Sequence, residues 1–330
     1  MKTNSKFIGI DVSKDTLDVC VLSEDCESTA IKNTERSICG FFKKLLRDSR
    51  ECQYHICIEN TGKYSWELMR ILPQMECLFY VVNPLHLKKS LGLVRGKNDV
   101  VDAMRIARFI KKNNDELCPY IPRREEVESL QILLAERKFR VGQRKQLKAK
   151  NKEMSVLGGS KLARSIISKN DRLIRELNGQ IKEIEAEMNR IIASDERLRD
   201  LATRLKSVPG VGDVLCGNLL VRTNEFRTIT NPRKLACYAG VAPFSNTSGI
   251  SVFGRNRVSN LADKGLKKLL HLGALSAIRL DNDLAAYYHR KISEGKNKMS
   301  VLNAVRNKII HIVFSLIKNQ TLFENRLVSS

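Results

Sequence analysis

The chain has 330 residues and carries 58 Lys and Arg against 36 Asp and Glu, a formal net charge of +22. Such an excess is typical of proteins that bind polyanions, nucleic acid first and an acidic membrane surface second. No run of about 18 apolar residues, no secretory signal and no Cys-x-x-Cys pair is found. These features disfavour a transmembrane span, secretion, disulfides and a cysteine zinc site, so we expect a cytoplasmic protein.

The first 122 residues alternate strand patterns with helical ones. Strands are predicted over residues 7–10, 17–22, 55–58 and 78–82. Helices are predicted over residues 34–46, 66–72 and 98–111. Two strands joined by the turn residues Ser13-Lys14-Asp15, followed by strand–helix alternation, predict an α/β sheet domain.

Four acids occupy the places where such a domain would present them. Asp11 and Glu59 each end a predicted strand, and Asp99 and Asp102 share one face of a predicted helix. Clustered acids repel one another unless cations lie between them, and two Mg²⁺ ions with oxygen ligands would resolve that conflict. Such a pair supports phosphoryl transfer, and the arrangement is that of an RNase H-like nuclease core. Taken singly, each acid is equally well explained as a cap or a surface ion-pair partner.

Three segments carry a family resemblance. They read Gly9-Ile10-Asp11-Val12-Ser13-Lys14, Glu59-Asn60-Thr61-Gly62-Lys63-Tyr64 and Lys97-Asn98-Asp99-Val100-Val101-Asp102-Ala103. They resemble the signatures of the DEDD transposases, bacterial insertion-sequence recombinases known for bridge-RNA guidance and related to the Piv DNA invertases. The resemblance implies a RuvC-like catalytic domain over residues 1–122, in which the four acids bind Mg²⁺, with Mn²⁺ as a substitute.

A charged helical arm is predicted over residues 123–203. Apolar residues from Ile174 to Ile191 are spaced three and four apart, which is a heptad seam, and Gly158-Gly159 is a candidate turn between antiparallel helices. Residues 140–175 contain eleven Lys and Arg residues and two acidic residues. A solvated helix face is the plain interpretation, but the one-sided charge favours phosphate contacts, with Arg144, Lys145 and Lys148 as candidates.

Residues 204–330 are predicted to form a mainly helical C-terminal domain. Within it, residues 205–215 read as helix, tight turn and helix, and Gly210 and Gly212 permit close backbone approach. The segment resembles a helix-hairpin-helix that contacts the DNA backbone, although a simple helix–helix turn has the same spacing. Further cations expected to bind nucleic acid are Lys97, Arg255, Arg257, Lys264, Lys267 and Lys268.

A serine near these cations is a candidate nucleophile. Ser248 precedes a glycine, and the surrounding positive charge would stabilise the charge that develops during attack on a phosphodiester. Most Ser-Gly pairs are turns. The same family carries a nucleophilic serine just before a glycine in this region, so the resemblance implies that Ser248 is the nucleophile. Ser245 and Ser251 are weaker candidates, kept because Thr247 and Ile250 depart from the common Ser-Ser-Gly-Gly form.

The resemblance as a whole implies a DNA transposase that works through a serine–DNA intermediate. Its partners would be donor and target DNA, a structured guide RNA and further copies of the chain, from dimer to tetramer. Two alternatives are a RuvC-like Holliday-junction resolvase that uses metal-activated water, and a non-catalytic basic coiled-coil protein that binds nucleic acid.

Two further expectations concern apolar surfaces. Aromatic residues make up 6% of the chain, so Trp66 and the other aromatic side chains are expected in the core rather than as base-stacking platforms. The basic helices lack an aromatic-rich apolar face, so no membrane partner is expected.

Overall fold

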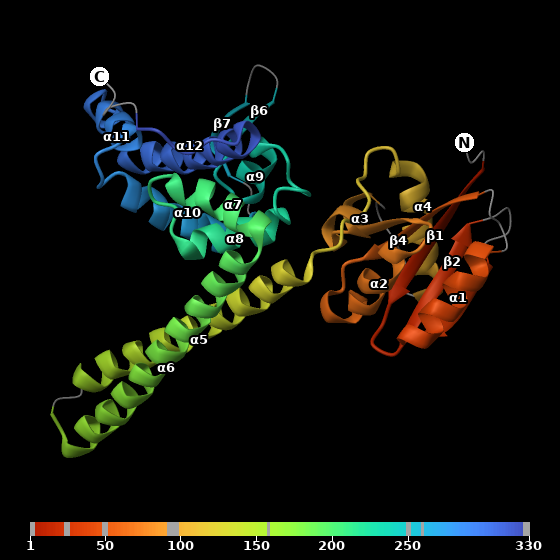
Figure 1. Cartoon of the computed structure of the whole chain (residues 1–330), viewed down its shortest axis with the longest axis horizontal. Coiled ribbons are helices and arrows are strands. Elements are labelled where there is room, and N and C mark those ends of the chain that lie inside the picture. The colour runs from red at the N-terminus through yellow and green to blue at the C-terminus, as the bar shows by residue number, and fades with distance from the viewer. Residues whose placement is uncertain are drawn as a thin grey trace. The chain divides into compact units, whose positions relative to one another are not determined.

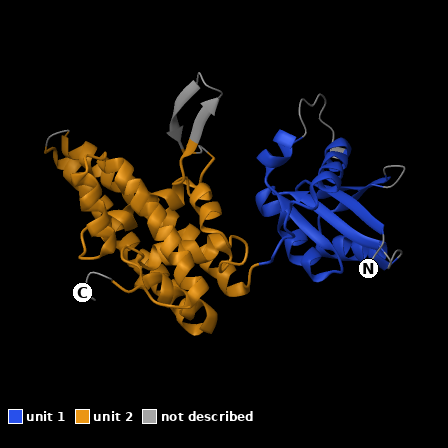
Figure 2. Cartoon of the chain, turned by 90° about the horizontal axis from the view of Figure 1, so that it is seen from above, with its two compact units in different colours: residues 1–122 blue, residues 123–330 orange. Residues whose placement is uncertain are grey.

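The computed structural model describes residues 4–22, 27–47, 52–90, 99–156, 159–248, 252–258 and 261–325. The chain divides into two compact units, residues 1–122 and residues 123–330, which Figure 2 colours separately. The first unit is mixed α/β with a five-stranded sheet, and the second is mostly helical. The α/β class predicted for the N-terminal part and the mainly helical class predicted for the rest are confirmed.

The N-terminal unit, red to gold in Figure 1, is built on one sheet. Its strands are β1 (Asn4–Val12), β2 (Thr16–Leu22), β3 (Glu27–Lys32), β4 (Cys52–Glu59) and β5 (Leu78–Val82). Its helices are α1 (Glu35–Arg47), η1 (Gly62–Ser65), α2 (Trp66–Ile71), η2 (Leu72–Gln74), α3 (Pro84–Ser90) and α4 (Asp99–Asn113). The strand order is β3-β2-β1-β4-β5, in which β1, β2 and β3 pair antiparallel and β1, β4 and β5 pair parallel.

Different helices cover the two faces of this sheet. Ile10 and Ile58 pack in a core with buried residues of α1 and α2. Cys57, the neighbour of Ile58, packs instead with Ile106 and Ile110 of α4. Because successive residues of a strand point to opposite faces, α1 and α2 lie against one face and α4 against the other.

The edge strand β3 is one of the elements that the sequence analysis missed; others are the helix α3 and the strands at Phe244–Ser248 and Val252–Arg257. Its residues Glu27–Lys32 are mostly exposed and show no apolar alternation. The strand pairs with β2 on one side only, in the described residues. An edge strand that packs little against the core carries no period-2 signal, so its pattern resembles a loop.

Eight helices and one hairpin make up the described part of the C-terminal unit. The helices are α5 (Glu125–Val156), α6 (Lys161–Ser194), α7 (Glu196–Ser207), α8 (Asp213–Thr223), α9 (Pro232–Tyr238), α10 (Lys264–Ala277), α11 (Asp283–Ser293) and α12 (Lys298–Asn319). Strands β6 (Phe244–Ser248) and β7 (Val252–Arg257) pair antiparallel.

Helices α5 and α6 lie side by side as a long arm (Figure 1). The predicted heptad seam is the contact surface, because Ile174, Ile181 and Met188 are buried. The seam therefore pairs two helices of one chain. Gly159 has φ +54°, a left-handed conformation suited to the turn before α6, while Gly158 lies outside the described residues.

The remaining helices surround a single hydrophobic core. Helix α12 runs through it, with Val305, Ile309 and Val313 buried. By length and composition α12 could cross a membrane, but half of its most apolar stretch is buried inside the unit. A core helix of a folded unit has this burial pattern, so α12 by itself is weak support for a membrane span.

Candidate functional site

Asp11 and Glu59 lie at the same edge of the sheet, on neighbouring strands. Ile10 of β1 is opposite Ile58 of β4, and the next residue on each parallel strand is one of these acids. Both side chains are half-buried. By strand alternation they point to the face that α4 covers. Across the other side of β1, Asp11 is opposite Asp18 of β2, a fifth acid that the sequence analysis did not single out.

Helix α4 crosses this face at very close range. A Cβ added to Gly9 would lie 2.1 Å from the carbonyl oxygen of Ala103 and 2.3 Å from the backbone nitrogen of Ala107. Only glycine allows a strand and a helix to approach this closely. Asp102 immediately precedes Ala103, so the contact brings the first turns of α4 over the end of β1.

The acids act on one another electrostatically. Burial raises the pKa of the Glu59 carboxyl, and the negative charge of Asp102 raises that pKa further. Asp102 also forms an ion pair within its own helix, because its Oδ1 accepts a hydrogen bond from Arg105 Nη1 at 2.5 Å. The structure thus brings Glu59 and Asp102 within electrostatic range, with Asp11 beside Glu59 in the sheet.

A complete metal-binding cluster is not formed by the side chains that the structure describes. Among them, no three His, Cys, Asp or Glu residues come together in a group that could hold a metal ion. Asp99 is placed by its backbone as the first residue of α4, but its side chain lies outside the described residues, as does all of Lys97.

The candidate serine lies in the small hairpin of the C-terminal unit. Ser248 is the last residue of β6 and is opposite Val252 of β7. Ser245 lies on β6, and Ser251 lies outside the described residues. The predicted cations Arg255 and Arg257 are on β7, so the pairing of the strands holds them in the same hairpin as Ser248.

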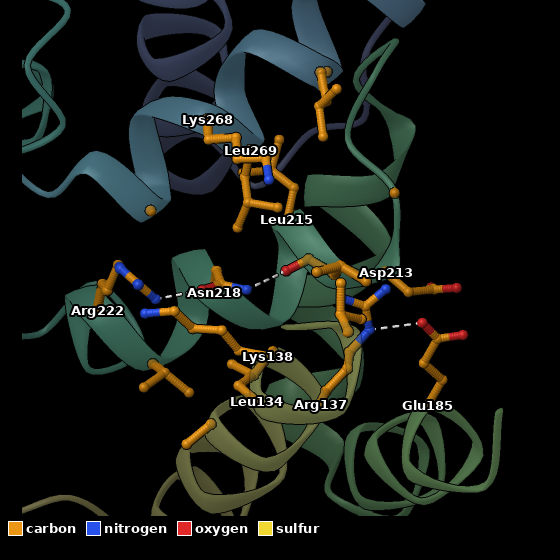
Figure 3. Close-up of a pocket in the computed structure, with 18 of the residues that line it drawn as sticks. Leu134, Arg137, Lys138, Glu185, Asp213, Leu215, Asn218, Arg222, Lys268 and Leu269 are labelled. Atoms are coloured by element: carbon orange, nitrogen blue, oxygen red, sulfur yellow. Dashed lines mark hydrogen bonds and ion pairs between the residues drawn. The ribbon is translucent and has the colours of Figure 1, made fainter. Parts of the chain in front are cut away.

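A large groove of about 1340 Å³ lies within the C-terminal unit. Figure 3 shows side chains from α5, α6, α8 and α10 converging on it. Its apolar lining includes Leu134, Leu215 and Leu269. Gly210 and Gly212, in the turn between α7 and α8, also line it.

Positive charge dominates this groove. Its cations are Arg123, Arg137, Lys138, Arg144, Lys145, Lys182, Arg222 and Lys268, and its acids are Glu185, Asp213 and Asp263. Each acid is already paired. The pairs are Arg137 Nε–Glu185 Oε1 at 2.6 Å, Arg222 Nε–Asp263 Oδ2 at 2.7 Å and Lys206 Nζ–Asp213 Oδ1 at 2.9 Å.

The groove lysines are left with uncompensated charge. Lys138, Lys145, Lys182 and Lys268 make no salt bridge to any acid within the described ranges. A groove with an apolar floor and uncompensated lysines is suited to the phosphate backbone and sugars of a nucleic acid.

Gly210 has a structural explanation of its own. Its φ is +87°, and a Cβ there would lie 2.1 Å from the carbonyl oxygen of Gly273 in α10. Gly212 is the N-cap residue of α8. Gly210 therefore allows α10 to pack against the turn between α7 and α8, whereas a Cβ on Gly212 would meet no atom within 4 Å.

Family comparisons agree with this architecture. Residues 8–157 match a family model of DEDD, IS110-type transposases. Residues 202–289 match the model of the IS116/IS110/IS902 transposase family. The two matches together span more than half of the chain. The chain belongs to the IS110 family of transposases.

Relatives of this transposase include DNA-rearranging proteins. It is 26% identical over 330 residues to the pilin gene-inverting protein of Moraxella bovis. The match covers 97% of this chain and 98% of the relative. The protein of the same name from Moraxella lacunata matches over the same shares. An uncharacterized 43.6 kDa protein of insertion element IS110 from Streptomyces coelicolor is 28% identical over 148 residues, 45% of this chain and 35% of that protein. The transposase is thus an enzyme of DNA recombination and transposition.

Some groove residues of the transposase were predicted and others were missed. Arg144, Lys145 and Lys268 line the groove as well as being predicted cations, whereas Lys148, Lys264 and Lys267 are not among its lining residues. The missed cations are Arg123, Arg137, Lys138, Lys182 and Arg222. Each of them lies on a helix that lines the groove, or just before one. The sequence analysis missed them because a count of charges does not show which helix faces pack together.

The expectation that the aromatic residues are buried is wrong for five of those that the structure describes. The exposed fractions are 54% for Trp66, 36% for Tyr64, 56% for Phe139, 43% for Tyr238 and 50% for Phe244. Other aromatic residues do lie in the core, and Phe42 and Tyr54 are almost completely buried. Tyr64 is the last residue of the family-like segment that begins with Glu59, and Trp66 is two residues beyond it.

Proposed function

We propose that this transposase cleaves and rejoins DNA for insertion-sequence mobility in a reaction that depends on a divalent cation. Two observations carry this proposal: Asp11 and Glu59 end neighbouring strands at one edge of the sheet, and Asp102 of α4 lies within electrostatic range of Glu59. The strand order, with three antiparallel strands followed by two parallel ones, supports an RNase H-like, RuvC-like domain. The pilin gene inversion named for the Moraxella relatives is likewise a rearrangement of DNA.

The acids fit a hard divalent cation. Asp11, Glu59, Asp99 and Asp102 offer carboxylate oxygens, the donors that Mg²⁺ prefers and Mn²⁺ accepts. The pKa of Glu59, raised in part by Asp102, indicates a repulsion that a bound cation would relieve. A bound pair of such ions would activate the attacking oxygen and stabilise the leaving oxygen. The protein's own share is to hold the four carboxylates and the scissile phosphate in place.

Ser248 supplies the nucleophile in this proposal. The bond from Ser248 Oγ to phosphorus forms while the bond from phosphorus to one deoxyribose oxygen breaks, and the serine proton leaves with the departing hydroxyl. Arg255 and Arg257 on the paired strand stabilise the extra negative charge of the phosphorus centre. A hydroxyl of the second strand reverses these steps, so the ester conserves the bond energy and no ATP is needed.

The groove of the C-terminal unit binds the nucleic-acid backbone in this proposal. Its uncompensated lysines contact phosphates, and the partners are donor DNA, target DNA and a structured guide RNA that supplies sequence specificity by base pairing. The transposase acts in the cytoplasm as a homo-oligomer, from dimer to tetramer.

A suicide DNA substrate tests the chemistry. The protein is incubated with Mg²⁺, with the DNA and with RNA transcribed from the non-coding sequence that flanks its gene. Denaturing gels then separate covalent adducts from free ends. We expect Ser248→Ala to lose the adduct and Ser245→Ala to retain it. Asp11→Asn should reduce cation-dependent cleavage by at least about a hundredfold, since even residues that only support metal ligands contribute 10- to 100-fold.

Three outcomes would contradict this proposal. An adduct that persists in Ser248→Ala would move the nucleophile to another residue. Free 5′-phosphate ends without any adduct would indicate a resolvase that uses activated water. Cleavage unaffected by Asp11→Asn would remove the acids from catalysis.

A further inference from the structure

The chain's single tryptophan is on the surface, close in sequence to the acidic edge. Trp66 begins α2, and its side chain is 54% exposed. Helix α2 does not need this ring for its own packing, because Leu68 and Leu72 just beyond it are completely buried. Tyr64, two residues earlier, exposes a second ring. Large aromatic rings gain free energy when they are covered, so an exposed pair marks a contact surface.

The loop that presents these rings is held by its own hydrogen bonds. The backbone nitrogen of Thr61 donates to Ser65 Oγ at 3.1 Å, and the hydroxyls of these two residues are 2.7 Å apart. Ser65 is completely buried. The backbone nitrogen of Gly62, at φ +74°, donates to Asn60 Oδ1 at 3.2 Å. The rings are therefore presented by a well-defined backbone.

Asn33 fixes this loop to the turn that follows Asp11. Its Nδ2 donates to the carbonyl oxygen of Ser13 at 3.0 Å and to that of Tyr64 at 3.0 Å. Ser13 is two residues beyond Asp11, and Tyr64 is five residues beyond Glu59. One side chain thus joins the two segments that leave the acidic edge, which places the loop that carries the rings at that edge of the sheet.

The charges beside the rings favour a nucleic acid over an apolar partner. The Lys63 ammonium is 5.2 Å from the centre of the Tyr64 ring, within cation–π range. Glu67, next to Trp66, is paired with Arg70 at 2.8 Å, and the same guanidinium is paired with Glu35 at 2.7 Å. Aromatic rings interleaved with positive charge are the combination that proteins use to stack bases and follow the backbone of a single strand.

From this juxtaposition we infer that Tyr64 and Trp66 form a stacking platform for a base of the DNA strand held at the acidic edge, with Lys63 against its phosphate. The inference rests on the proposed function, because it takes DNA as the substrate. The platform would keep the strand next to the scissile bond unpaired and would hold it at the edge of the sheet where Asp11 and Glu59 lie.

Tryptophan fluorescence tests the platform directly, because Trp66 is the single emitter of its kind in the chain. The full chain is titrated, without divalent cation, with a fluorescein-labelled DNA single strand and with a strand of equal length built from abasic nucleotides. Binding is followed by the anisotropy of the label. We expect the base-bearing strand to quench Trp66 emission and the abasic strand to bind without quenching.

Two variants separate stacking from charge. Trp66→Leu should weaken binding of the base-bearing strand by roughly 5- to 150-fold, the range of one base–aromatic stack, and leave binding of the abasic strand unchanged. Trp66→Phe retains a ring and should bind the base-bearing strand within a few-fold of the unaltered protein. The side chain is exposed, so both variants are expected to fold, which circular dichroism checks.

The outcomes distinguish this inference from the proposed function. Equal quenching by both strands, or unaltered binding by Trp66→Leu, overturns the platform while DNA binding and the proposed function stand. Quenching by RNA but not by DNA, or an emission change with protein concentration alone, assigns the surface to another partner and also overturns it. Binding of neither strand overturns the DNA substrate and the platform together.

Discussion

Glu59 is held in an environment that disfavours its charge. Its carboxyl is half-buried at the end of β4, and both burial and the charge of Asp102 raise its pKa. A carboxyl whose pKa is raised by folding contributes stability below its unfolded-state pKa and loses that contribution as the pH rises through its folded-state pKa. At neutral pH and without a cation, the raised pKa of Glu59 therefore lowers the free energy of unfolding.

Replacing Glu59 with glutamine should stabilise the cation-free protein at neutral pH. We expect Glu59→Gln to raise the free energy of unfolding by up to about 1 kcal/mol, because solvent screens a half-exposed carboxylate. The gain should vanish below the ordinary pKa of 4.5, where Glu59 is protonated in any case. Urea unfolding at acid and neutral pH measures this difference.

The same variant reports on the cation. Mg²⁺ should raise the midpoint of thermal unfolding of the unaltered protein, because a ligand that binds the folded state stabilises it, and should raise it less for Glu59→Gln. Equal stabilisation of both proteins by Mg²⁺ would show that Glu59 does not bind the ion.

At the scale of elements, the crossing of β1 and α4 positions the site. Gly9 lets the two backbones touch, and the strand and helix that meet there carry Asp11 and Asp102. The clash that a Cβ would cause is with backbone atoms of Ala103, which cannot turn away as a side chain would. Any larger residue at this position must push α4 outward and carry Asp102 away from the sheet.

Gly9→Ala should therefore impair both stability and cleavage. We expect a loss of about 1 to 3 kcal/mol in the free energy of unfolding, the usual cost of overpacking, together with reduced cation-dependent cleavage. Denaturant unfolding and the suicide-substrate assay measure the two effects.

Two control variants interpret this result. Gly40→Ala in α1 meets no atom within 4 Å and should stabilise the helix slightly. Leu68→Ala, in the core against the opposite face, should destabilise the unit without moving α4 directly. The two destabilised variants are compared at equal stability. If Gly9→Ala then cleaves DNA as fast as Leu68→Ala, the position of α4 is unimportant for cleavage.

At the scale of the whole molecule, the excess of positive charge becomes a localised binding surface. The net charge is +22, and the groove of the C-terminal unit concentrates part of it where α5 and α6 face α8 and α10. The acids of that groove are each already paired, so its lysines remain available to phosphates. Binding of DNA should accordingly release counterions and weaken steeply with salt.

Removing groove lysines should reduce this salt dependence. The slope of log K against log salt concentration is expected to fall by about 0.7 to 0.9 for each of Lys138→Ala and Lys268→Ala, if each contacts one phosphate. Anisotropy titrations at several salt concentrations measure the slope. Lys43→Ala, an exposed lysine of α1 in the other unit, is the matched control and should leave it unchanged. Slopes that fall equally for all three variants would show that the groove is not a distinct binding surface.

Local patterns in the sequence by themselves determined the sheet and helix classes, the acids that end strands and the helical seam of the arm. Alternation, heptad spacing and composition are properties of neighbouring residues, so no structure is needed to see them. The missed β3 marks the limit of this reasoning, because an exposed edge strand carries no such pattern.

The tertiary structure decided which distant residues meet. It set Asp11 opposite Asp18 as well as beside Glu59, joined the arm to the turn at Gly210 in one groove, and left Trp66 exposed. Each of these depends on strand register or on helix packing between segments far apart in the chain. Such contacts depend on how buried surfaces fit together in space, and that fit is not written in any single stretch of residues.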